Sequence, residues 1–296
     1  MAPALTFLAA PGGGVQCPAG GRAGTDVPAA GFHGRLLADS KETGEGDDMS
    51  SAGDVQALVT DPRLVEERRG QIIRAAVKLF SEEGYYTTTI QQIARAAGVS
   101  TGLIYQYFRD KDDILFLTLK LVLDTYEHEI PPQLEGTSHP VERLCMAIWT
   151  YCKIVDGLLD ATVLAYRSTK SLRSDRRVLV KDAETRTNRL IEECLEACVA
   201  GGYMREINVH LLAYQLVMFA HSWALKHWAL RERYALAEYV SEGINILIDP
   251  FLTAKGRRVL DAMRERTGSF GSLGRKATTR PGIAKGRLAT GKKRTR

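Results

Sequence analysis

The chain has 296 residues, of which 45% are hydrophobic and 25% are charged, so a sizeable core can be buried. No repeat of the solenoid kind is evident, and no apolar stretch approaches the roughly 18–20 residues that span a bilayer, which excludes a repeat array and a membrane protein. The net charge is +5, but residues 268–296 contain nine Lys or Arg and no acid, which leaves −4 for residues 1–267. The basicity therefore lies in a tail. Since no segment is apolar enough to span a bilayer, a cytoplasmic location is expected.

Residues 1–60 are rich in Gly, Ala, Asp and Pro and show no sustained periodicity, a composition that predicts a disordered extension. The segment after Met49 resembles an ordinary protein start. We therefore expect that residues 1–48 derive from an upstream start codon and are absent from the native protein.

The first predicted helix begins at Asp61, a suitable N-cap, with Pro62 at the first helical position. Its apolar residues recur near a period of 3.6: Ile72, Ile73, Ala76, Val77, Leu79 and Phe80. Gly84 is placed to end the helix. An amphipathic helix over about 61–83 follows from this pattern.

Two short helices come next, separated by a single tight turn. Thr88 is the expected N-cap of the first, Gly98 ends it, and Ser100 caps the second, "TGLIYQYF". Two short helices joined by a turn that contains glycine are typical of a helix-turn-helix. We therefore predict a DNA-binding domain over residues 61–111.

The rest of the chain is predicted to be helical. Asp110 can cap a long helix that runs to "PPQLEG", and further helices are expected at 139–156, 158–172, 175–200, 208–231 and 235–248. Since no segment alternates with period two, the predicted fold is all-α, with a second helical domain over 112–254. Residues 255–296 are predicted to form a disordered basic tail, which either adds sequence-independent attraction to DNA or only improves solubility.

The second helix of a helix-turn-helix lies in the major groove of DNA, which explains two exposed tyrosines in "STGLIYQYF". Leu103, Ile104 and Phe108 are expected to face inward. The residues expected to face DNA are Thr101, Gly102, Tyr105, Gln106 and Tyr107. Glutamine suits adenine and tyrosine hydroxyls suit phosphate, while Lys111 is placed to meet the DNA backbone. The alternative is that the two tyrosines only cover the core with their hydroxyls exposed.

Residues 70–115 carry the pattern "AA..LF...G" followed by "TT...IA..AGVS.G..Y.YF..K..L", which resembles the DNA-binding domain of the TetR (tetracycline repressor) family. The resemblance implies a homodimeric, ligand-responsive regulator, usually a repressor. It implies DNA contacts from Thr88 or Thr89 at the start of the second helix, from the recognition segment and from Lys111. The recognition segment comprises Ser100, Thr101, Gly102, Tyr105, Gln106 and Tyr107. Many relatives have His where this chain has Gln106 or Tyr107, so base preference does not transfer.

Charge also favours a dimer. Residues 61–120 contain nine basic and eight acidic residues, so a single domain would bind DNA weakly, whereas two recognition helices double the contacts. The helices expected at 208–231 and 235–248 are long and apolar, and "VHLLAYQLVMFAHSWALKHWALRER" is apolar nearly all round. We predict that these two helices of each chain form a four-helix interface.

The resemblance further implies that residues 112–254 form a helical ligand-binding and dimerisation domain. Its effector pocket, among the other helices, rests on the family and not on spacing. Its candidate lining residues are Met146, Trp149, Leu164, Tyr166, Phe219 and Trp223, although ordinary core packing explains each of them at least as well. An apolar or amphipathic effector fits such a lining, and a fatty acyl-CoA, a steroid-like molecule and a drug are all candidates. Cations at 166–177, among them Arg173 and Arg176, are candidates for an anionic head group or for a solvated helix end.

No catalytic residues, metal site or cofactor are expected, because the sequence lacks a nucleophile elbow, a phosphate-binding glycine loop and metal-ligand spacing among its histidines and cysteines. The predicted partners are double-stranded operator DNA, a small-molecule effector and a second copy of the chain. The effector is expected to swing the helix at about 111–130 and release the operator. The alternatives are a helical enzyme or interaction protein with an accessory helix-turn-helix, and a transcriptional activator.

Overall fold

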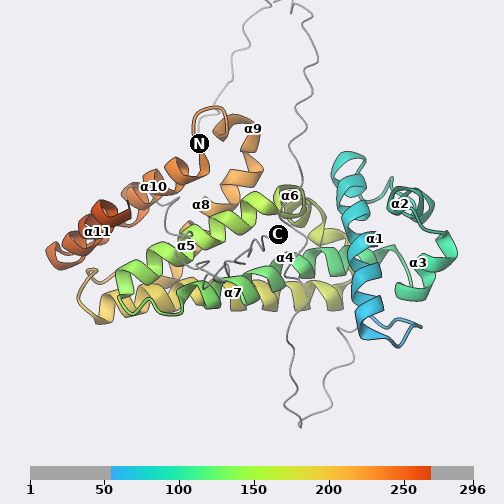
Figure 1. Cartoon of the computed structure of the whole chain (residues 1–296), viewed down its shortest axis with the longest axis horizontal. Helices are drawn as coiled ribbons and strands as arrows, with labels where there is room; N and C mark the ends of the chain where they lie inside the picture. Colours follow the sequence, from blue (N-terminus) through green and yellow to red (C-terminus); the bar gives the residue numbers. More distant parts are fainter. Residues whose placement is uncertain (1–54, 268–296) are drawn as a thin grey trace, which may run out of the picture. The chain divides into compact units, whose positions relative to one another are not determined.

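The structure, a computed structural model, describes residues 55–267 (Figure 1). Helices make up nearly all of this range, and its only bridge of the β type joins Met204 to Leu252. The predicted all-α fold is confirmed. Among the residues described, no helix combines the length and the apolarity that crossing a membrane requires. The expectations for residues 1–48 and for the tail beyond 267 lie outside the described residues.

Four helices form the N-terminal part of this range: α1 (Pro62–Glu82), α2 (Ile90–Ala97), α3 (Thr101–Tyr107) and α4 (Lys111–Leu134). The predicted N-caps of α1, α3 and α4 are confirmed, because the side chains of Asp61, Ser100 and Asp110 accept hydrogen bonds from the first free backbone N–H groups. Gly98 ends α2 with φ of 68°, a left-handed conformation that favours glycine. The caps define the residues at which α1, α3 and α4 begin, and Gly98 defines where α2 ends.

The N-terminal helices bury a core of their own. Ile72, Ala76 and Phe80 of α1 pack with Ile93 of α2 and Ile104 of α3, and the first turns of α4 complete this core. Val55, which lies in the predicted disordered extension, is 3% exposed and belongs to the same core. The extension is therefore ordered from residue 55 onward.

The C-terminal part is a bundle of helices. Its elements are α5 (Pro140–Gly157), α6 (Leu159–Ser168), η1 (Thr169–Ser171), α7 (Ser174–Ala200), α8 (Val209–Leu225), α9 (His227–Leu230), α10 (Leu236–Leu247), η2 (Asp249–Phe251) and α11 (Ala254–Thr267). Helix α5 packs against α4, α7 and α8 and supplies much of the second core (Figure 1).

Three predicted boundaries differ from the structure. Helix α4 continues through Pro131 and Pro132 and ends at Leu134, within the segment where a break was expected. The helix expected at 208–231 is interrupted at Lys226, which separates α8 from α9. The segment expected at 158–172 ends as the short 3₁₀ turn η1.

The prediction of a disordered tail from residue 255 is wrong for residues 255–267. Ala254–Thr267 form α11, and its side chains Leu260 and Met263 are buried in the C-terminal core. The main-chain N–H of Thr253 donates to the carbonyl of Tyr203 at 2.9 Å and fixes the start of this helix. Val259 packs partly against the same core. So few apolar residues stand in a basic segment that its composition concealed the helix.

Candidate nucleic-acid interface and effector site

The connection between α2 and α3 is a tight turn. The main-chain N–H of Val99 donates to the carbonyl of Ala94 at 2.9 Å, and Ser100 Oγ accepts a hydrogen bond from Leu103 N at 3.1 Å. Because each end of the turn is capped, α3 has little freedom to rotate about its axis relative to α2. The chain thus forms the predicted helix-turn-helix.

Helix α3 has an inner face and an outer face. Ile104 and Phe108 are buried, as predicted, while Gly102, Tyr105 and Gln106 are exposed and Thr101 is half-buried. Tyr105 retains 50% of its surface in solvent, a high value for a tyrosine on a capped helix. These outward side chains combine hydroxyl, amide and aromatic groups, which suit contacts with base edges and phosphates.

Tyr107 was predicted to face DNA, and this prediction is wrong. Its side chain is 2% exposed and packs in the N-terminal core. Tyr107 lies three residues after Ile104 on α3, so both occupy the same face of the helix. Its main-chain carbonyl accepts hydrogen bonds from Arg69 Nε at 3.3 Å and from Arg69 Nη2 at 3.2 Å.

Thr88 was expected to cap α2, but its neighbour Thr89 is the N-cap. Thr88 is fully buried, and its hydroxyl donates to the carbonyl of Gly84 at 2.8 Å. Thr89 is the N-cap: its Oγ1 accepts from Gln92 N at 3.2 Å, and Gln92 Oε1 accepts from Thr89 N at 2.8 Å. This reciprocal capping leaves Thr89 exposed at the start of α2.

Lys111 was predicted to contact the DNA backbone, but its donors are already used. Its Nζ donates to the carbonyls of Tyr85, Tyr86 and Thr88 at 2.7, 3.3 and 2.8 Å. The same Nζ lies 4.6 Å from the centroid of the Tyr85 ring, and burial lowers the pKa of the ammonium. An ammonium has three N–H donors, so Lys111 stabilises the loop between α1 and α2 and has none left for phosphate.

The C-terminal end of α3 is held by a segment that sequence analysis missed. Leu58 N donates to the carbonyl of Gln106 at 2.8 Å, and Arg69 donates to the carbonyl of Val55. Residues 55–58 therefore lie along the end of the recognition helix and satisfy carbonyls that a seven-residue helix leaves free. The contacts are mainly main-chain contacts, which leave no signature in the sequence.

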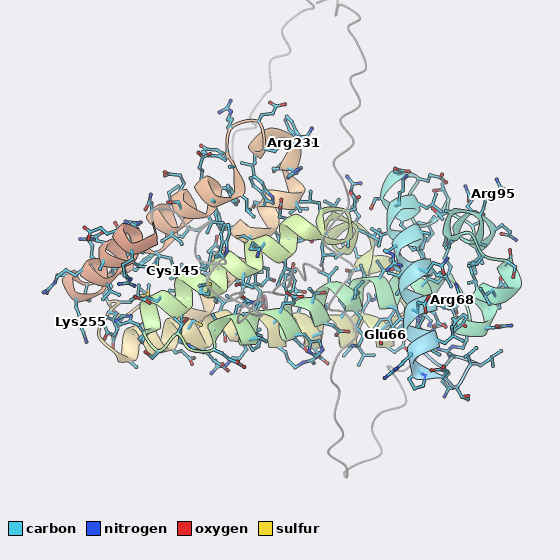
Figure 2. All side chains as sticks on the ribbon, viewed as in Figure 1. Glu66, Arg68, Arg95, Cys145, Arg231 and Lys255 are labelled. Atoms are coloured by element: carbon cyan, nitrogen blue, oxygen red, sulfur yellow. The ribbon has the colours of Figure 1, made fainter. Side chains whose placement is uncertain are left out.

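Two arginines of the helix-turn-helix domain, Arg68 and Arg95, were not among the predicted site residues, and Figure 2 labels both. Arg68 of α1 donates to Gln71 at 2.9 Å, and the Gln71 amide in turn donates to the carbonyl of Ala97 at 2.7 Å, which joins α1 to the end of α2. Arg95 is exposed in the last turn of α2. Arg95 thus places a solvent-exposed positive charge next to the turn between α2 and α3.

Acidic residues at the start of α4 bind arginines from two other elements. Asp113 is fully buried and accepts hydrogen bonds from Arg109 N at 2.7 Å and from Arg176 of α7. Burial alone raises the pKa of this carboxyl, but the hydrogen bonds from Arg109 and Arg176 outweigh it and hold the pKa below its usual range. Arg173 pairs with Asp110 at 3.2 Å. Arg173 and Arg176, two of the candidates for an anionic head group, are therefore neutralised within the chain.

A polar cluster lies between α4, α5, α6 and α8, and all of its members except the exposed Tyr166 are buried. His221 Nδ1 lies 2.8 Å from Tyr166 Oη, and its Nε2 lies 3.2 Å from Tyr151 Oη and 3.4 Å from Tyr126 Oη. Burial lowers the pKa of His221 to about 4, so the imidazole is neutral near pH 7. The Tyr126 and Tyr151 rings stack with centroids 4.1 Å apart. The cluster offers hydroxyl and imidazole groups inside an otherwise apolar bundle.

Comparison with known proteins covers both halves of the chain. Residues 72–117 match the profile of the bacterial regulatory proteins of the tetR family, and residues 137–228 match a tetracyclin repressor-like C-terminal domain. The chain is 71% identical over 213 residues to the HTH-type transcriptional regulator HbdR of Aromatoleum sp. (strain CIB), which covers 72% of this chain and 93% of that protein. The chain belongs to the tetR family.

Two further TetR-family similarities are more distant. The fatty acid metabolism regulator protein of Bacillus subtilis (strain 168) is 22% identical over 179 residues, 60% of this chain and 92% of that protein. The crystal structure of AibR in complex with isovaleryl coenzyme A and operator DNA has a TM-score of 0.55 and 19% identity, covering 62% of this chain and all of that one. These similarities show the fold. Since both halves match one family of regulators, the chain is a transcriptional regulator with a DNA-binding domain, and the enzyme alternative is not supported.

The six residues predicted to line the effector pocket of this TetR-family chain lie in different surroundings. Tyr166 belongs to the polar cluster, whereas Leu164 packs with the N-terminal core. Trp223 Nε1 donates to Asp156 at 2.7 Å, and the Phe219 ring stacks on Tyr239 with centroids 4.4 Å apart. Met146 and Trp149 lie on α5 within the second core. Leu164 thus lies apart from the others, while Phe219 and Trp223 both contact Tyr239, and the effector role of the six stays a prediction.

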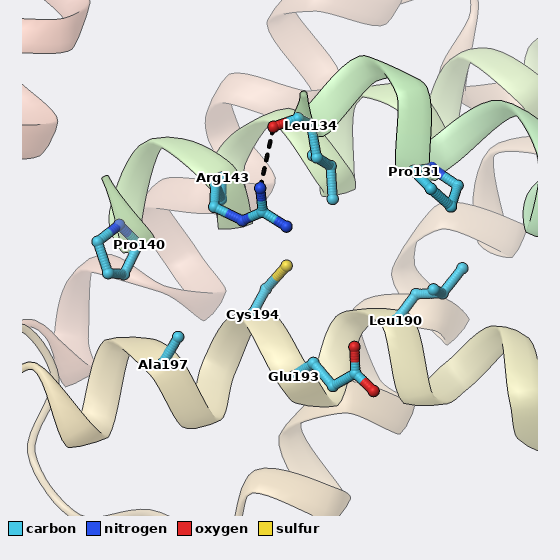
Figure 3. A pocket seen from close by; sticks show the side chains of 8 residues that line it. All are labelled: Pro131, Leu134, Pro140, Arg143, Leu190, Glu193, Cys194 and Ala197. Carbon is cyan, nitrogen blue, oxygen red and sulfur yellow. Dashed lines mark hydrogen bonds between the residues drawn. The ribbon is translucent and has the colours of Figure 1, made fainter. Parts of the chain in front are cut away.

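A pocket of about 280 Å³ lies between α4, α5 and α7 (Figure 3). Its lining comprises Pro131, Leu134, Pro140, Arg143, Leu190, Glu193, Cys194 and Ala197, none of which was predicted. Arg143 Nη1 donates to the Leu134 carbonyl at 2.9 Å, so this guanidinium is partly occupied in joining α5 to the end of α4. Groups of histidine, cysteine and acidic residues that could hold a metal ion are absent from the part of the chain described.

Proposed function

We propose that this regulator is a homodimeric repressor that binds an operator through α3 and releases it when an amphipathic small molecule enters the C-terminal bundle. The single observation that supports DNA recognition is the outer face of α3, where Thr101, Gly102, Tyr105 and Gln106 stand on a helix capped at both ends. Gly102 carries no side chain, so the DNA backbone can approach α3 closely at that point. A repressor of chromosomal genes acts where the chromosome lies, which supports a cytoplasmic location.

Exposed apolar side chains support the dimer. Among the described residues, large hydrophobic side chains stand in solvent on the last helices and the connections between them: Leu211, Met218, Trp228, Tyr234 and Ile246. Exposed apolar side chains on neighbouring elements are consistent with a protein–protein interface. The predicted interface through α8 and α10 is consistent with this distribution, and a dimer supplies the second recognition helix that a nearly neutral domain needs.

The polar cluster supports an effector that carries a hydrogen-bonding group as well as apolar surface. The amide of Asn188 on α7 is 1% exposed, and within the described residues neither its oxygen nor its nitrogen has a hydrogen-bond partner. Glu184, one turn earlier on α7, interacts electrostatically with Tyr151 and Tyr166 of the cluster. Because buried amides are nearly always paired, a ligand whose polar atoms reach this region completes what the chain leaves open.

An acyl-CoA-type effector agrees with the relatives. AibR binds isovaleryl coenzyme A together with operator DNA, and the Bacillus subtilis relative is a regulator of fatty acid metabolism. A thioester joins an apolar acyl chain to polar atoms, which matches an apolar bundle with a polar centre. The remaining alternative is a transcriptional activator. An activator would contact DNA through the same residues of α3 but would increase transcription of its target genes.

Fluorescence anisotropy with duplexes tiled across the gene's own promoter region tests this function. We expect one duplex to bind at least about 10³-fold more tightly than an unrelated duplex, and isovaleryl- or palmitoyl-coenzyme A to weaken that binding where free coenzyme A does not. Equal binding to all duplexes contradicts the operator. A specific complex that ignores both thioesters contradicts the effector class only.

A further inference from the structure

Two segments far apart in the sequence meet at a buried ion pair between α4 and α7. The guanidinium of Arg176 is 2% exposed, and its Nη1 lies 3.0 Å from Asp112 Oδ2 while its Nη2 binds Asp113 Oδ1. Its Cζ lies 4.9 Å from the centroid of the Phe116 ring. Since all partners of this cation lie on the first two turns of α4, α7 is bound to α4 where the DNA-binding domain begins.

The same carboxylate also holds the end of the recognition helix. Asp113 Oδ2 accepts hydrogen bonds from Arg109 N at 2.7 Å and from Arg109 Nε at 3.3 Å. Arg109 directly follows Phe108, the C-cap of α3. We call Arg109, Asp113 and Arg176 together the Asp113 junction, in which one carboxylate joins the end of α3 to the start of α7.

Because Asp113 and Arg176 of the Asp113 junction are buried, their charged groups cannot move apart without a large loss of stability. A buried charge without its partner is strongly unfavourable, so a small displacement of α7 must either carry Asp113 along or break the pair. The planar fork of arginine fits two carboxylate groups at fixed angles, which restricts rotation as well as translation. Displacement of α7 is therefore converted into displacement of the residues that end α3.

Helix α7 also reaches the region proposed for the effector. Its buried face runs from Arg176 through Val180, Ala183 and Thr187 to the unpaired Asn188. Twelve residues of helix separate Arg176 from Asn188, which corresponds to roughly 18 Å along a rigid element. The two ends of one helix face thus contact the effector region and the Asp113 junction.

We propose that Arg176 is a positioning residue that couples α7 to the recognition helix through Asp113, so that occupancy of one domain changes the other. This regulation rests on the proposed function, because it concerns release of the operator. Coupling between two sites is reciprocal, so operator DNA must alter α7 as much as an effector at α7 alters operator binding. The reciprocal direction requires no knowledge of the effector.

Hydrogen–deuterium exchange of the full chain, with and without the promoter duplex, measures this coupling. In the wild-type protein we expect the duplex to slow amide exchange in α2 and α3, and to change exchange over residues 174–190 by roughly fivefold or more. In Arg176→Lys, which keeps the charge but loses the fork, the effect on α2 and α3 persists and the change over 174–190 is lost.

Arg186→Met is the matched control. Arg186 also joins α7 to α4, through Glu127 at 3.0 Å, but this pair is exposed and lies away from α3. The control is expected to behave as the wild type. If Arg176→Lys fails to fold, the neutral pair Arg176→Gln with Asp113→Asn leaves no unpaired buried charge and is expected to show the same loss.

Each outcome is decisive. A wild-type protein whose α2 and α3 respond to the duplex while residues 174–190 do not overturns the coupling without any variant. A response over 174–190 that survives in Arg176→Lys, or in the neutral pair, overturns the role of Arg176. Absence of any response in α2 and α3 to every promoter duplex refutes operator binding itself, and the coupling falls with it.

Discussion

Lys111 Nζ donates a hydrogen bond to the main-chain carbonyl of Tyr85 at 2.7 Å and lies against the ring of the same residue. The lysine at the start of α4 therefore closes the loop that leads into α2, and it does so from inside the domain. Its charge supports the position of the helix-turn-helix instead of neutralising DNA.

Lys111→Met is expected to lower the free energy of unfolding by about 1–3 kcal/mol, because three carbonyls, two of them in partly buried hydrogen bonds, lose their donor. It is also expected to leave the dependence of operator affinity on salt unchanged, whereas loss of a phosphate contact reduces the slope by about 0.9. Urea unfolding and anisotropy at several salt concentrations measure both effects. Lys120→Met, which removes an exposed cation paired with Asp124, is the control for stability. A reduced slope in Lys111→Met would show that the lysine contacts phosphate after all.

The two tyrosines of α3 are expected to separate binding from stability. Tyr105→Ala removes an exposed side chain, so stability should change by less than about 0.5 kcal/mol while operator affinity falls at least about tenfold. Tyr107→Ala removes a buried ring and should cost about 3–5 kcal/mol of stability. Thermal unfolding and anisotropy on the same samples distinguish them. Equal loss of stability in both variants would contradict the assignment of inner and outer faces.

Stability is expected to fall in mild acid because of His221. Its pKa in the folded protein is about 4, below the ordinary value of about 6.5, so the unfolded chain binds more protons between these pH values. The contribution is complete above pH 6.5, falls as the pH drops through this window, and is of order 3 kcal/mol. His221→Gln should lose less stability than the wild type between pH 7 and 4.5 in urea unfolding. His128→Gln, at an exposed position of α4, should follow the wild type; identical curves for all three would place the histidine in solvent.

The dimer is tested at the apolar surface of α10. Ile246 is 68% exposed, so Ile246→Glu should fold normally yet shift the protein from dimer to monomer and abolish tight operator binding. Val178→Glu is the matched control, because Val178 is 56% exposed on α7, outside the proposed interface. Analytical ultracentrifugation gives the mass of each variant. A wild-type protein that sediments as a monomer, or an Ile246→Glu variant that stays dimeric, would exclude this interface.

The sequence was sufficient for the fold and for the order of the helices because helix signals are local. Asp61, Ser100 and Asp110 each cap the helix that immediately follows them, and Gly98 ends α2 as expected. Periodicity also separates Tyr105 from Tyr107, since Tyr107 is three residues after Ile104 and shares its face. The error at Tyr107 arose from treating a phenol as an exposed group when its position on the helix placed it in the core.

What could not be predicted depends on contacts between distant residues. The partners of Lys111 are carbonyls more than twenty residues earlier, and the partner of Arg176 is a carboxylate 63 positions away. A cation in the sequence looks the same whether it meets phosphate, an effector or its own chain. His221 interrupts an apolar helix, which is a local signal of a buried polar group, but its three tyrosines come from three other helices.

Residues 55–58 have a practical bearing on how the protein is produced. A protein that begins at Asp61 would lack Val55, which packs in the N-terminal core, and Leu58, whose N–H donates to the Gln106 carbonyl. Such a version would be expected to read its operator poorly for reasons unrelated to DNA chemistry. An affinity tag joined close to Val55 would likewise emerge beside the recognition helix, so the opposite terminus is the safer place for it.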